Sequence, residues 1–423
     1  MKGIEEKQIE APYELPEGWK WCRLGEVADW GSGGTPSRKN PEYYQGSIPW
    51  IKTGELNETY IFDSEEKVSE DAIKHSSAKI FPKETVVMAM YGATIGKTAI
   101  FGIDASTNQA CACAICHKEL DNHFLFNFLK SKKDYFLYNA KGGAQPNISQ
   151  EIIKNTLIPL PPTLAEQQRI VKRIESMFAK LDEAKEKAQN VVDGFEIRKA
   201  AILHKAFSGE LTANWRKENG VCDDSWVEKL FDSCIAKMQN GLSKRSGNEG
   251  EETVVLRLAN MGEDDFDVSD LRTIKLTSKE KNNYSLAKND VVMIRVNGSK
   301  TNVGRQLLVK NNKGWSFCDH IIRIQFEVFC LPNYMVYFSK TKEYIDYVQD
   351  NMVSSAGQNT ISRKGLSNLS LKVPTLPEQQ EIVRILEIII EKENKAKQAA
   401  EAVLEQIDLL KKSILARAFR GEL

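Results

Sequence analysis

The sequence lacks an apolar run of the roughly 18 residues that cross a bilayer, and it has no excess of charge of either sign. Lysine and arginine together number 58, as do aspartate and glutamate. The 8 cysteines are too few and too irregularly spaced for a disulfide framework, and the first residues are charged and lack the apolar core of a secretory signal. We therefore expect a cytoplasmic, membrane-free protein, in which any nucleic-acid binding must depend on local patches.

Catalytic and cofactor-binding motifs are incomplete. Gly92-Ala93-Thr94-Ile95-Gly96-Lys97-Thr98 has three residues between its glycines, where a phosphate-binding P-loop has four. Asn40-Pro41-Glu42-Tyr43 lacks the second proline of the amino-methyltransferase tetrapeptide, and no glycine-rich turn precedes it to bind S-adenosylmethionine. Asp63, Glu65 and Lys67 have the spacing of a nuclease triad, but such spacing is frequent by chance in charged chains. The sequence thus predicts no catalytic residue and no cofactor in this chain.

The sequence contains two tandem copies of one unit. Residues 166–171 return at 378–383, and residues 206–211 return at 418–423. Fainter matches join residues 37–39 to 243–245, 86–88 to 291–293 and 145–149 to 358–362. The offset changes slowly, as expected of diverged copies of one domain. We predict a globular domain at 1–160, a helical tail at 161–212, a second globular domain at 213–373 and a second tail at 374–423.

The cysteines are predicted to be core thiols. Cys113, Cys116 and His117 have the spacing of a haem attachment site, and Cys111 adds a third thiol. In the second copy, however, isoleucines stand where Cys111 and Cys113 stand in the first. Such positions belong to the buried face of a strand. The sequence therefore predicts no metal ligand here.

Each tail is predicted to be one long helix. Thr163 with Glu166 and Thr375 with Glu378 have the spacing of a capping box, and glycines 209 and 421 stand where helix C-caps are expected. Apolar residues follow a heptad pattern that only Glu393 interrupts. The predicted helix-pairing residues are Ile170, Ile174, Met177, Leu181, Ala184 and Ala188 in the first tail, and Ile382, Leu386, Ile389, Ala396, Ala400 and Val403 in the second, continued by Ile407, Leu410 and Ile414.

The heptad pattern predicts that the two helices pair antiparallel, with small residues allowing close approach. That arrangement places the globular domains at opposite ends, with an approximate two-fold axis. The alternative is that each helix packs on its own globular domain. Within the globular copies, strands are expected at 84–90 and 290–295 and short helices near 124–129 and 334–338, so the predicted class is α+β.

Polar and basic residues recur with aromatic neighbours at matching positions of both copies. Guanidinium, amide and ammonium groups on loops are the groups that contact base edges and phosphates. Two clusters that recur in register favour DNA binding over ordinary surface charge. The predicted DNA-binding residues are Thr35, Ser37, Arg38, Lys39, Lys52, Tyr91, Thr94 and Lys97 in the first copy, and Lys244, Arg245, Arg257, Arg295, Asn297, Lys300, Asn302 and Arg305 in the second.

The chain resembles the specificity subunits of type I restriction-modification systems. The resemblance depends on the tails, Pro161-Pro162-Thr163-Leu164-Ala165-Glu166-Gln167-Gln168 and Pro374-Thr375-Leu376-Pro377-Glu378-Gln379-Gln380, each ending in Ala-Phe-Ser/Arg-Gly-Glu-Leu, and on the domain openings Leu15-Pro16-Glu17-Gly18-Trp19 and Ile48-Pro49-Trp50-Ile51. It implies two target recognition domains that each bind half of a bipartite double-stranded DNA site, and helical tails that dock two methyltransferase subunits. It also implies that S-adenosylmethionine, ATP and Mg²⁺ bind to the methyltransferase and restriction subunits, where adenine methylation and cleavage occur.

Two other functions stay open at this point. A fused restriction-type enzyme would carry its own nuclease or adenine methyltransferase centre, and it would bind S-adenosylmethionine as an isolated chain. A coiled-coil scaffold without a DNA role fits less well, since the two large domains have diverged while the tails have not.

Overall fold

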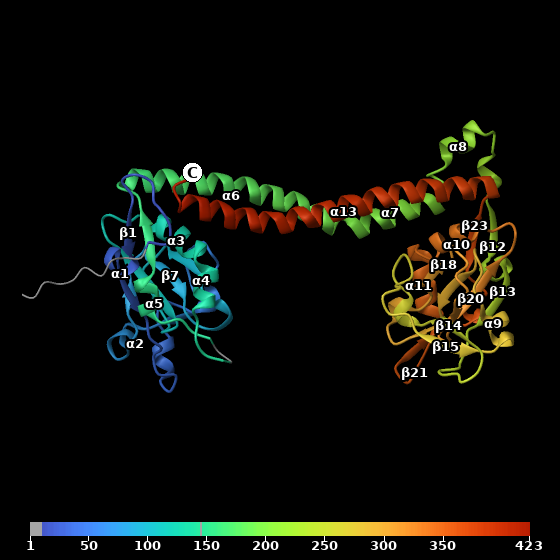
Figure 1. Cartoon of the computed structure of the whole chain (residues 1–423), viewed down its shortest axis with the longest axis horizontal. Coiled ribbons are helices and arrows are strands. Elements are labelled where there is room, and N and C mark those ends of the chain that lie inside the picture. Colours follow the sequence, from blue (N-terminus) through green and yellow to red (C-terminus); the bar gives the residue numbers. More distant parts are fainter. Residues whose placement is uncertain (1–10, 144–145) are drawn as a thin grey trace, which may run out of the picture. The chain divides into compact units, whose positions relative to one another are not determined.

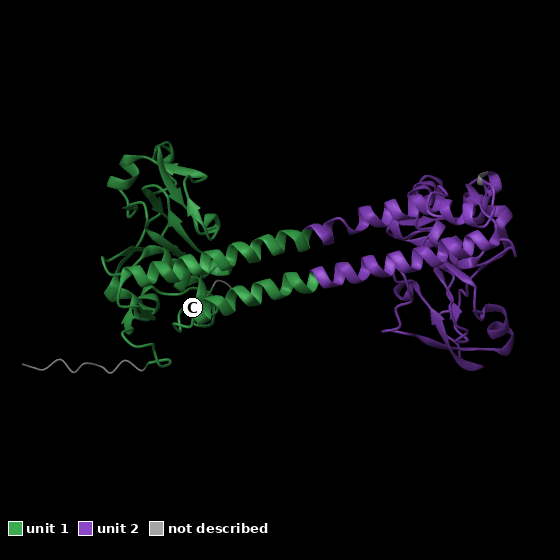
Figure 2. Cartoon of the chain, turned by 90° about the horizontal axis from the view of Figure 1, so that it is seen from above, with its two compact units in different colours: residues 1–189, 401–423 green, residues 190–400 purple. Residues whose placement is uncertain are grey.

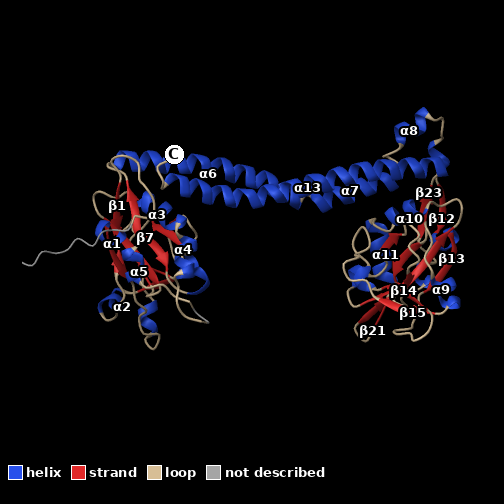
Figure 3. Cartoon of the chain, viewed as in Figure 1, coloured by secondary structure: helices blue, strands red, loops and turns tan. Residues whose placement is uncertain are grey.

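The computed structural model describes residues 11–143 and 146–423. The chain forms two compact units, residues 1–189 with 401–423 and residues 190–400, drawn in green and purple in Figure 2. Each unit consists of a globular domain and parts of the long helices, because helix α13 (Leu376–Ala418) belongs to both. Strands lie in the globular domains and the long tails are helical (Figure 3). Among the described residues, no helix is long and apolar enough to cross a membrane.

The first globular domain has a five-stranded sheet, a four-stranded sheet and a strand pair. The five-stranded sheet has the order β2 (Ala28–Ser32), β10 (Cys111–Cys116), β7 (Val86–Ala89), β8 (Thr98–Phe101) and β4 (Tyr60–Ile61). The four-stranded sheet has the order β5 (Glu66–Val68), β3 (Ile48–Ile51), β9 (Ala105–Thr107) and β6 (Ile80–Phe81), and β1 (Lys20–Arg23) pairs with β11 (Leu157–Leu160). The helices are α1 (Leu24–Val27), α2 (Glu70–Lys74), α3 (Asn122–Ser131), α4 (Lys133–Tyr138) and α5 (Gln150–Asn155).

The second globular domain repeats this plan and adds a small sheet (Figure 1). Its four-stranded sheet has the order β13 (Ile235–Asn240), β20 (Ile321–Phe326), β16 (Val291–Ile294) and β18 (Gln306–Leu308). One three-stranded sheet has the order β15 (Thr273–Leu276), β14 (Glu251–Leu256) and β19 (Ser316–Phe317), and the other has the order β17 (Val296–Asn297), β22 (Gln358–Thr360) and β21 (Val353–Ser355). Strand β12 (Val227–Leu230) pairs with β23 (Ser370–Val373). The helices are α9 (Ser278–Tyr284), α10 (Pro332–Phe338), α11 (Lys342–Asn351) and α12 (Arg363–Leu366).

The predicted elements of the globular copies are confirmed. The two apolar runs are the buried strands β7 and β16, and the two expected short helices are α3 and α10. Parallel pairs stand among antiparallel partners in both domains, β3 with β9 and β4 with β8 in the first and β14 with β19 in the second, so the sheets are mixed. The predicted α+β class is therefore correct.

The Glu-Gln-Gln motif of each tail is explained by its middle residue. Gln167 is fully buried, accepts a hydrogen bond from the Asp121 N–H and donates to the Glu119 carbonyl, both at 2.9 Å. Gln379 is also fully buried, accepts from the Leu331 N–H and donates to the Phe329 carbonyl, both at 2.8 Å. The glutamine thus fastens the loop before α3 or α10 to the first turn of the tail helix in both units.

The first tail is two helices, α6 (Leu164–Asp193) and α7 (Phe195–Phe207), whereas α13 is continuous. The expectation of a single helix in the first tail is therefore wrong. The break lies at Gly194, where the second tail has Gln406, and glycine costs about 1 kcal/mol relative to alanine inside a helix. The C-cap prediction is confirmed by the positive φ of Gly209 and Gly421.

Both interpretations of the tails hold. Ile170 and Ile174 of α6 lie in the core of the first globular domain, together with Phe419 from the end of the chain. In the same unit α6 also contacts the last part of α13, since the Lys411 and Asp182 side chains form an ion pair. The Arg169 guanidinium donates to the carbonyl of Leu423, which follows α13, at 2.7 Å. Residues further along α6 thus meet residues earlier in α13, which makes the pair antiparallel.

The second unit has the same arrangement. Ile382 and Leu386 lie in the core of its globular domain with Leu203 of α7. The Arg198 guanidinium and the Glu393 carboxylate form an ion pair at 2.7 Å between α7 and the first part of α13. The pairing of tail helices is therefore present within each unit, while the approximate two-fold axis stays a prediction.

The seam of α13 differs from the heptad prediction. Ala396, Val403 and Leu410 are exposed, so their assignment to the seam is wrong. Most predicted members of the first tail, and Ile382, Leu386, Ala400 and Ile407 of the second, are buried or half-buried. The side chain of Glu393 is only 25% exposed and lies in the seam, because Arg198 supplies its counter-charge. A heptad assignment that accepts only apolar residues therefore assigns the wrong residues to this helix-pairing seam.

Candidate nucleic-acid interface

Three loop segments that carry predicted DNA-binding residues meet in the first domain. They begin at Gly33, at Lys52 and at Tyr91, and all three adjoin the connection between β9 and β10. Three main-chain hydrogen bonds join them to it: Gly34 N–H to Thr107 C=O (2.9 Å), Asn108 N–H to Ile51 C=O (3.1 Å) and Met90 N–H to Ala110 C=O (2.8 Å). Residues far apart in the sequence are thereby placed on one framework.

The second domain repeats this framework at the connection between β19 and β20. The corresponding hydrogen bonds are Leu242 N–H to Phe317 C=O (2.9 Å), Cys318 N–H to Leu256 C=O (3.0 Å) and Arg295 N–H to His320 C=O (2.8 Å). Gly33 and Gly241 explain the close approach of the first segment, since a Cβ atom would lie 1.9 Å from the Thr107 carbonyl oxygen or 2.1 Å from that of Cys318. The matching positions inferred from sequence therefore coincide in the two folds.

Ion pairs hold the basic residues of the first domain. The Arg38 guanidinium lies 2.6 Å from the Glu66 carboxylate and 4.0 Å from the centre of the Tyr44 ring, and Lys52 contacts the same carboxylate at 3.1 Å. The hydrogen bond from Arg38 and that from Lys52 lower the pKa of Glu66. Arg38 keeps 56% of its side-chain surface exposed. Exposed pairs of this kind contribute about 0–1 kcal/mol, so phosphate can replace the carboxylate.

The other residues of the first loop are placed as the sequence suggests. Thr35, Ser37 and Lys39 are exposed, and the Thr35 hydroxyl bonds the Gln109 side chain. The Ser37 hydroxyl accepts a hydrogen bond from the Lys39 N–H at 3.4 Å. The loop therefore presents hydroxyl and ammonium groups beside the paired Arg38.

The cations in the first loop of the second domain are also paired, although Arg245 is exposed. Lys244 lies 3.0 Å from Glu280, and Arg245 lies 3.1 Å from Asp319. Arg257 pairs with Asp270 at 2.9 Å, at the position that matches the pair of Lys52 with Glu65 in the first domain. A cation held by a carboxylate is thus a common feature of both surfaces.

The third segment ends in a 3-10 turn in each domain. In the first domain the Thr94 hydroxyl donates to the Tyr91 carbonyl at 2.9 Å, Tyr91 is 45% exposed and Lys97 is half-buried. In the second domain Lys300 is exposed, whereas Arg295, Asn297 and Asn302 are half-buried. Hydroxyl, amide and basic groups are therefore accessible at this turn in both domains.

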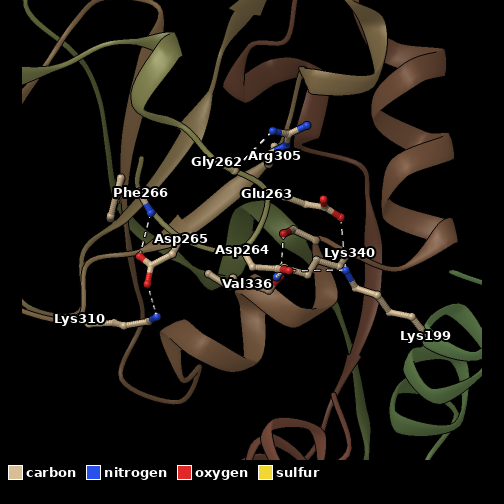
Figure 4. A network of polar contacts seen from close by, with 11 residues as sticks. Lys199, Gly262, Glu263, Asp264, Asp265, Phe266, Arg305, Lys310, Val336 and Lys340 are labelled. Carbon is tan, nitrogen blue, oxygen red and sulfur yellow. Dashed lines mark hydrogen bonds and ion pairs between the residues drawn. The ribbon is translucent and has the colours of Figure 1, made fainter. Parts of the chain in front are cut away.

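Arg305 differs from the expectation of a loop cation open to DNA. Its guanidinium donates to the Gly262 carbonyl at 3.3 Å (Figure 4). It also donates to the Met261 carbonyl at 3.3 Å and to the Asn302 side chain at 2.5 Å. The neighbouring Asp264 contacts Lys340, in the turn after α10, and Lys199 of α7, and the latter is largely buried (Figure 4). These contacts fix α7 to the globular domain of the second unit and give Arg305 a structural task.

Cysteines 111 and 113 are core residues, as predicted: both are fully buried in β10. Burial raises the pKa of the Cys113 thiol to about 12. Among the described residues, one cluster of three potential metal ligands occurs, Cys318, Asp319 and His320, with ligand atoms within 4.8 Å of one another. Its carboxylate faces Arg245, and the first domain has Asn108 and Gln109 in the matching connection, so no metal site is assigned there.

Sequence reasoning missed Gln109 and Asp319. Each lies at the matching position of the connection that joins the three segments, and each contacts the first segment, through Thr35 and Arg245 respectively. The available signal was a polar residue directly between two short buried strands in both copies. These two side chains extend the candidate interface.

Comparison with known proteins agrees with this architecture. The family model described as "Type I restriction modification DNA specificity domain" matches residues 16–192 and 234–406. The StySPI specificity subunit of Salmonella potsdam is 30% identical over 422 residues, covering 97% of this chain and 90% of that protein. The EcoKI specificity subunit of Escherichia coli K12 is 27% identical over 427 residues, with the same coverage. The crystal structure of the HsdS subunit from Thermoanaerobacter tengcongensis superposes with a TM-score of 0.65 at 20% identity, covering 98% of this chain and 100% of that one.

Two variable domains joined to paired helical tails define a DNA specificity subunit. The chain belongs to the family of type I restriction-modification specificity subunits. It is the non-catalytic component of such a system, with two target recognition domains, and S-adenosylmethionine, ATP and Mg²⁺ belong to the methyltransferase and restriction subunits. The alternatives of a fused enzyme and of a scaffold without a DNA role are thereby excluded.

Proposed function

We propose that residues 1–160 and 213–373 each bind one half of a bipartite double-stranded DNA site through the three joined loop segments. The helical tails dock two methyltransferase subunits that methylate an adenine in each half-site, and restriction subunits join through this complex. The observation that carries the proposal is the repeated framework: the same three hydrogen bonds join the same three segments in both domains, while the side chains on them differ. A constant framework with variable side chains is what reading two different sequences requires. A cytoplasmic location stays a prediction.

The test removes the cations of one loop at a time in the complex with its methyltransferase subunits. Arg38→Ala with Lys39→Ala should impair only the first half-site, and Lys244→Ala with Arg245→Ala only the second. Each lost phosphate contact reduces the slope of log affinity against log salt by about 0.9, whereas a lost base contact relaxes one position of the methylated sequence. Salt-dependent DNA binding and methylome sequencing measure the two effects.

A matched control removes two cations at the other end of the first domain. Lys20 begins β1, and Lys118 follows β10 at the end opposite the joined loops; both are exposed. The double variant Lys20→Ala with Lys118→Ala should leave the salt slope and the methylated sequence unchanged. An equal loss in the control and the loop variants would contradict the proposed surface.

The docking of methyltransferase subunits is proposed to use apolar residues that the tail helices leave exposed. Ile197 of α7 is 75% exposed and Leu409 of α13 is 67% exposed, and they occupy the same position of the two tails. Because a single exposed apolar residue is common, the support for an interaction site is its recurrence at the same position of both tails. Two equivalent positions fit two copies of one partner.

Ile197→Asp or Leu409→Asp alone should remove one methyltransferase subunit, and the double variant both, as counted by native mass spectrometry. Because the side chains are exposed, the folded units should persist. Val268→Asp, at a 53% exposed apolar residue in the second globular domain, is the control. Unchanged stoichiometry in the double variant would show that these positions are not the docking site.

A further inference from the structure

The guanidinium of Arg38, in the first loop segment of the first domain, is held by two kinds of contact. It lies over the Tyr44 ring at 4.0 Å and is 5.5 Å from the centre of the Trp50 ring. Its Nη1 atom lies 2.6 Å from the Glu66 carboxylate. An arginine on a surface loop ordinarily samples many rotamers. The aromatic rings and the carboxylate therefore restrict this guanidinium to a small range of orientations.

The residues that hold Arg38 are placed by the four-stranded sheet. Trp50 is buried in β3 and stands directly opposite Glu66 of β5 in the register of the two strands. The Tyr44 ring packs edge-on against Trp50, with ring centres 5.8 Å apart. The Lys52 ammonium contacts the same Glu66 carboxylate at 3.1 Å. Groups supported by strands are placed more precisely than groups supported by a loop alone.

The conformation of the loop does not depend on Arg38. The Tyr44 hydroxyl donates to the Pro36 carbonyl at 2.7 Å, and the Trp50 indole donates to the Gly34 carbonyl at 2.9 Å. The side chain of Arg38 is 56% exposed, and an exposed ion pair adds little to stability. The restricted guanidinium is therefore explained by a task at the surface and not by the stability of the loop.

The charge of Arg38 is balanced within the protein. Arg38 contacts Glu66, and Lys52 contacts both Glu66 and Glu65, so two cations face two carboxylates. The attraction of phosphates depends on positive charge that the protein leaves uncompensated. The next residue, Lys39, is exposed and forms no ion pair with any described residue, so it suits a phosphate contact better. Arg38 is instead suited to a contact that depends on the direction of its N–H groups.

The head group at this position differs between the two domains. Residues 37–39 correspond to residues 243–245, so Lys244 stands where the first domain has Arg38. Lys244 is also held by a carboxylate, that of Glu280, at 3.0 Å. An ammonium is a compact point charge, whereas a guanidinium presents five N–H donors in one plane. A position that keeps its carboxylate support while its head group changes is expected of a residue that distinguishes two half-sites.

A guanidinium that is held through one nitrogen keeps donors for a second partner, and the contact with Glu66 is made by Nη1. Arginine donates two hydrogen bonds to the O6 and N7 atoms of guanine in the major groove, the commonest specific contact of a side chain with DNA. We propose that Arg38 makes this contact with one guanine in the half-site bound by residues 1–160, with Glu66 and Tyr44 as positioning residues. This inference rests on the proposed function of the joined loops and names the base that one of them reads.

The test uses the complete complex of this chain with its methyltransferase subunits. Arg38→Lys keeps the charge but loses the planar set of donors. It should lower the preference for guanine at one position of the first half-site about 10- to 100-fold, the range of one bidentate base contact, in methylome sequencing and in titrations with each base at that position. The salt slope and the second half-site should not change. Glu66→Gln should relax the same position, an effect that a carboxylate with a merely structural task would not have.

Lys39→Arg is the matched control, because Lys39 is exposed on the same loop and the exchange also keeps the charge. It should leave the methylated sequence unchanged. A second measurement uses the wild-type complex and a duplex with 7-deazaguanine, which lacks the N7 acceptor, at the guanine in question. Binding should weaken about 10-fold, and this loss should disappear in Arg38→Lys.

Three results would each overturn the inference. They are a first half-site without guanine in either strand, an unaltered methylated sequence in Arg38→Lys, and a reduced salt slope with an unaltered sequence in Arg38→Ala, which would indicate a phosphate contact. Failure of the proposed function would instead appear in the wild-type complex, as methylation without a bipartite pattern.

Discussion

The buried glutamine of each tail offers a sharp test of what holds a globular domain to its helix. Gln379 is fully buried, and its side chain makes three hydrogen bonds, to the Leu331 N–H and to the Phe329 and Pro374 carbonyls, all at 2.8 Å. Gln379→Ala removes all three and leaves one donor and two acceptors without these bonds, at the half-buried Leu331 and Phe329 and the buried Pro374. The neighbouring Gln380 is exposed, so Gln380→Ala makes the same chemical change without burying an unpaired group.

The magnitude follows from the cost of an unsatisfied buried polar group, about 1–3 kcal/mol each. Relaxation of the loop before α10 and entry of water reduce the sum, so we expect a loss of about 3 kcal/mol for Gln379→Ala and less than about 0.5 kcal/mol for Gln380→Ala. For a unit of about 200 residues, each kcal/mol lowers the melting temperature by about 2–4 °C. The transition of the second unit should therefore move down by about 6–12 °C.

Calorimetry of the full chain, with hydrogen exchange to assign each transition to its unit, measures this effect. The transition of the first unit should stay in place, and Gln167→Ala should show the reverse selectivity, with exposed Gln168→Ala as its control. Equal small effects of Gln379→Ala and Gln380→Ala would refute the reasoning, because the repeated motif would then not act through its buried glutamine.

Three further predictions concern charges. Glu66→Gln should raise DNA affinity for all sequences and steepen the salt dependence in fluorescence anisotropy titrations, because its two cations become available to phosphates; unchanged titrations would contradict this. Replacing Arg198 and Glu393 together by leucine should leave the urea unfolding of the second unit unchanged or strengthen it, since apolar side chains continue the seam, and a loss above about 2 kcal/mol would argue against a shared seam. Burial raises the pKa of Asp264, but its contacts with Lys340 and Lys199 outweigh burial, so the pKa is lowered overall. The ionised carboxylate therefore stabilises the folded state above about pH 4, and this contribution is lost as the pH falls through the folded-state pKa. Asp264→Asn should therefore flatten the acid limb of stability against pH in urea titrations.

The fold of the globular domains could be predicted from sequence because the chain states it twice. Val86-Val87-Met88 alone is an ambiguous short apolar run, but its return as Val291-Val292-Met293 in the same context identifies a buried strand. The same comparison identified the core thiols. Cysteine in one copy stands where the other has isoleucine, and the two residue types have in common that they are apolar and frequently buried. The matched pair of Lys52 and Arg257 was likewise found by register and confirmed in structure by their equivalent carboxylate partners.

Contacts that depend on three-dimensional partners could not be predicted. Thr375 and Glu378 have the spacing of a capping box. The Glu378 carboxylate is nevertheless fully buried, and one of its oxygens accepts hydrogen bonds from Thr212 and Arg216, both at 2.7 Å. Arg216 belongs to helix α8 (Ala213–Glu218), which lies beyond the repeated tail and has no apolar pattern of its own. Likewise, the carboxylates that pair with Arg38 and Lys244 follow the loops by tens of residues and carry no local signal.

Helix α13 has apolar residues outside its helix-pairing seam, and these residues suggest a further contact. Ala396, Val403 and Leu410 were assigned to the seam because they are apolar at heptad spacing, and Glu393 was treated as an interruption because it is charged. In the structure Glu393 lies in the seam and is neutralised by Arg198, so α13 carries more apolar residues than the pairing covers. Leu409 and Leu410 are 67% and 48% exposed. Neither side chain gains the free energy of apolar burial in this chain alone. Surplus apolar surface on a helix whose seam is already complete is what a further protein partner would cover.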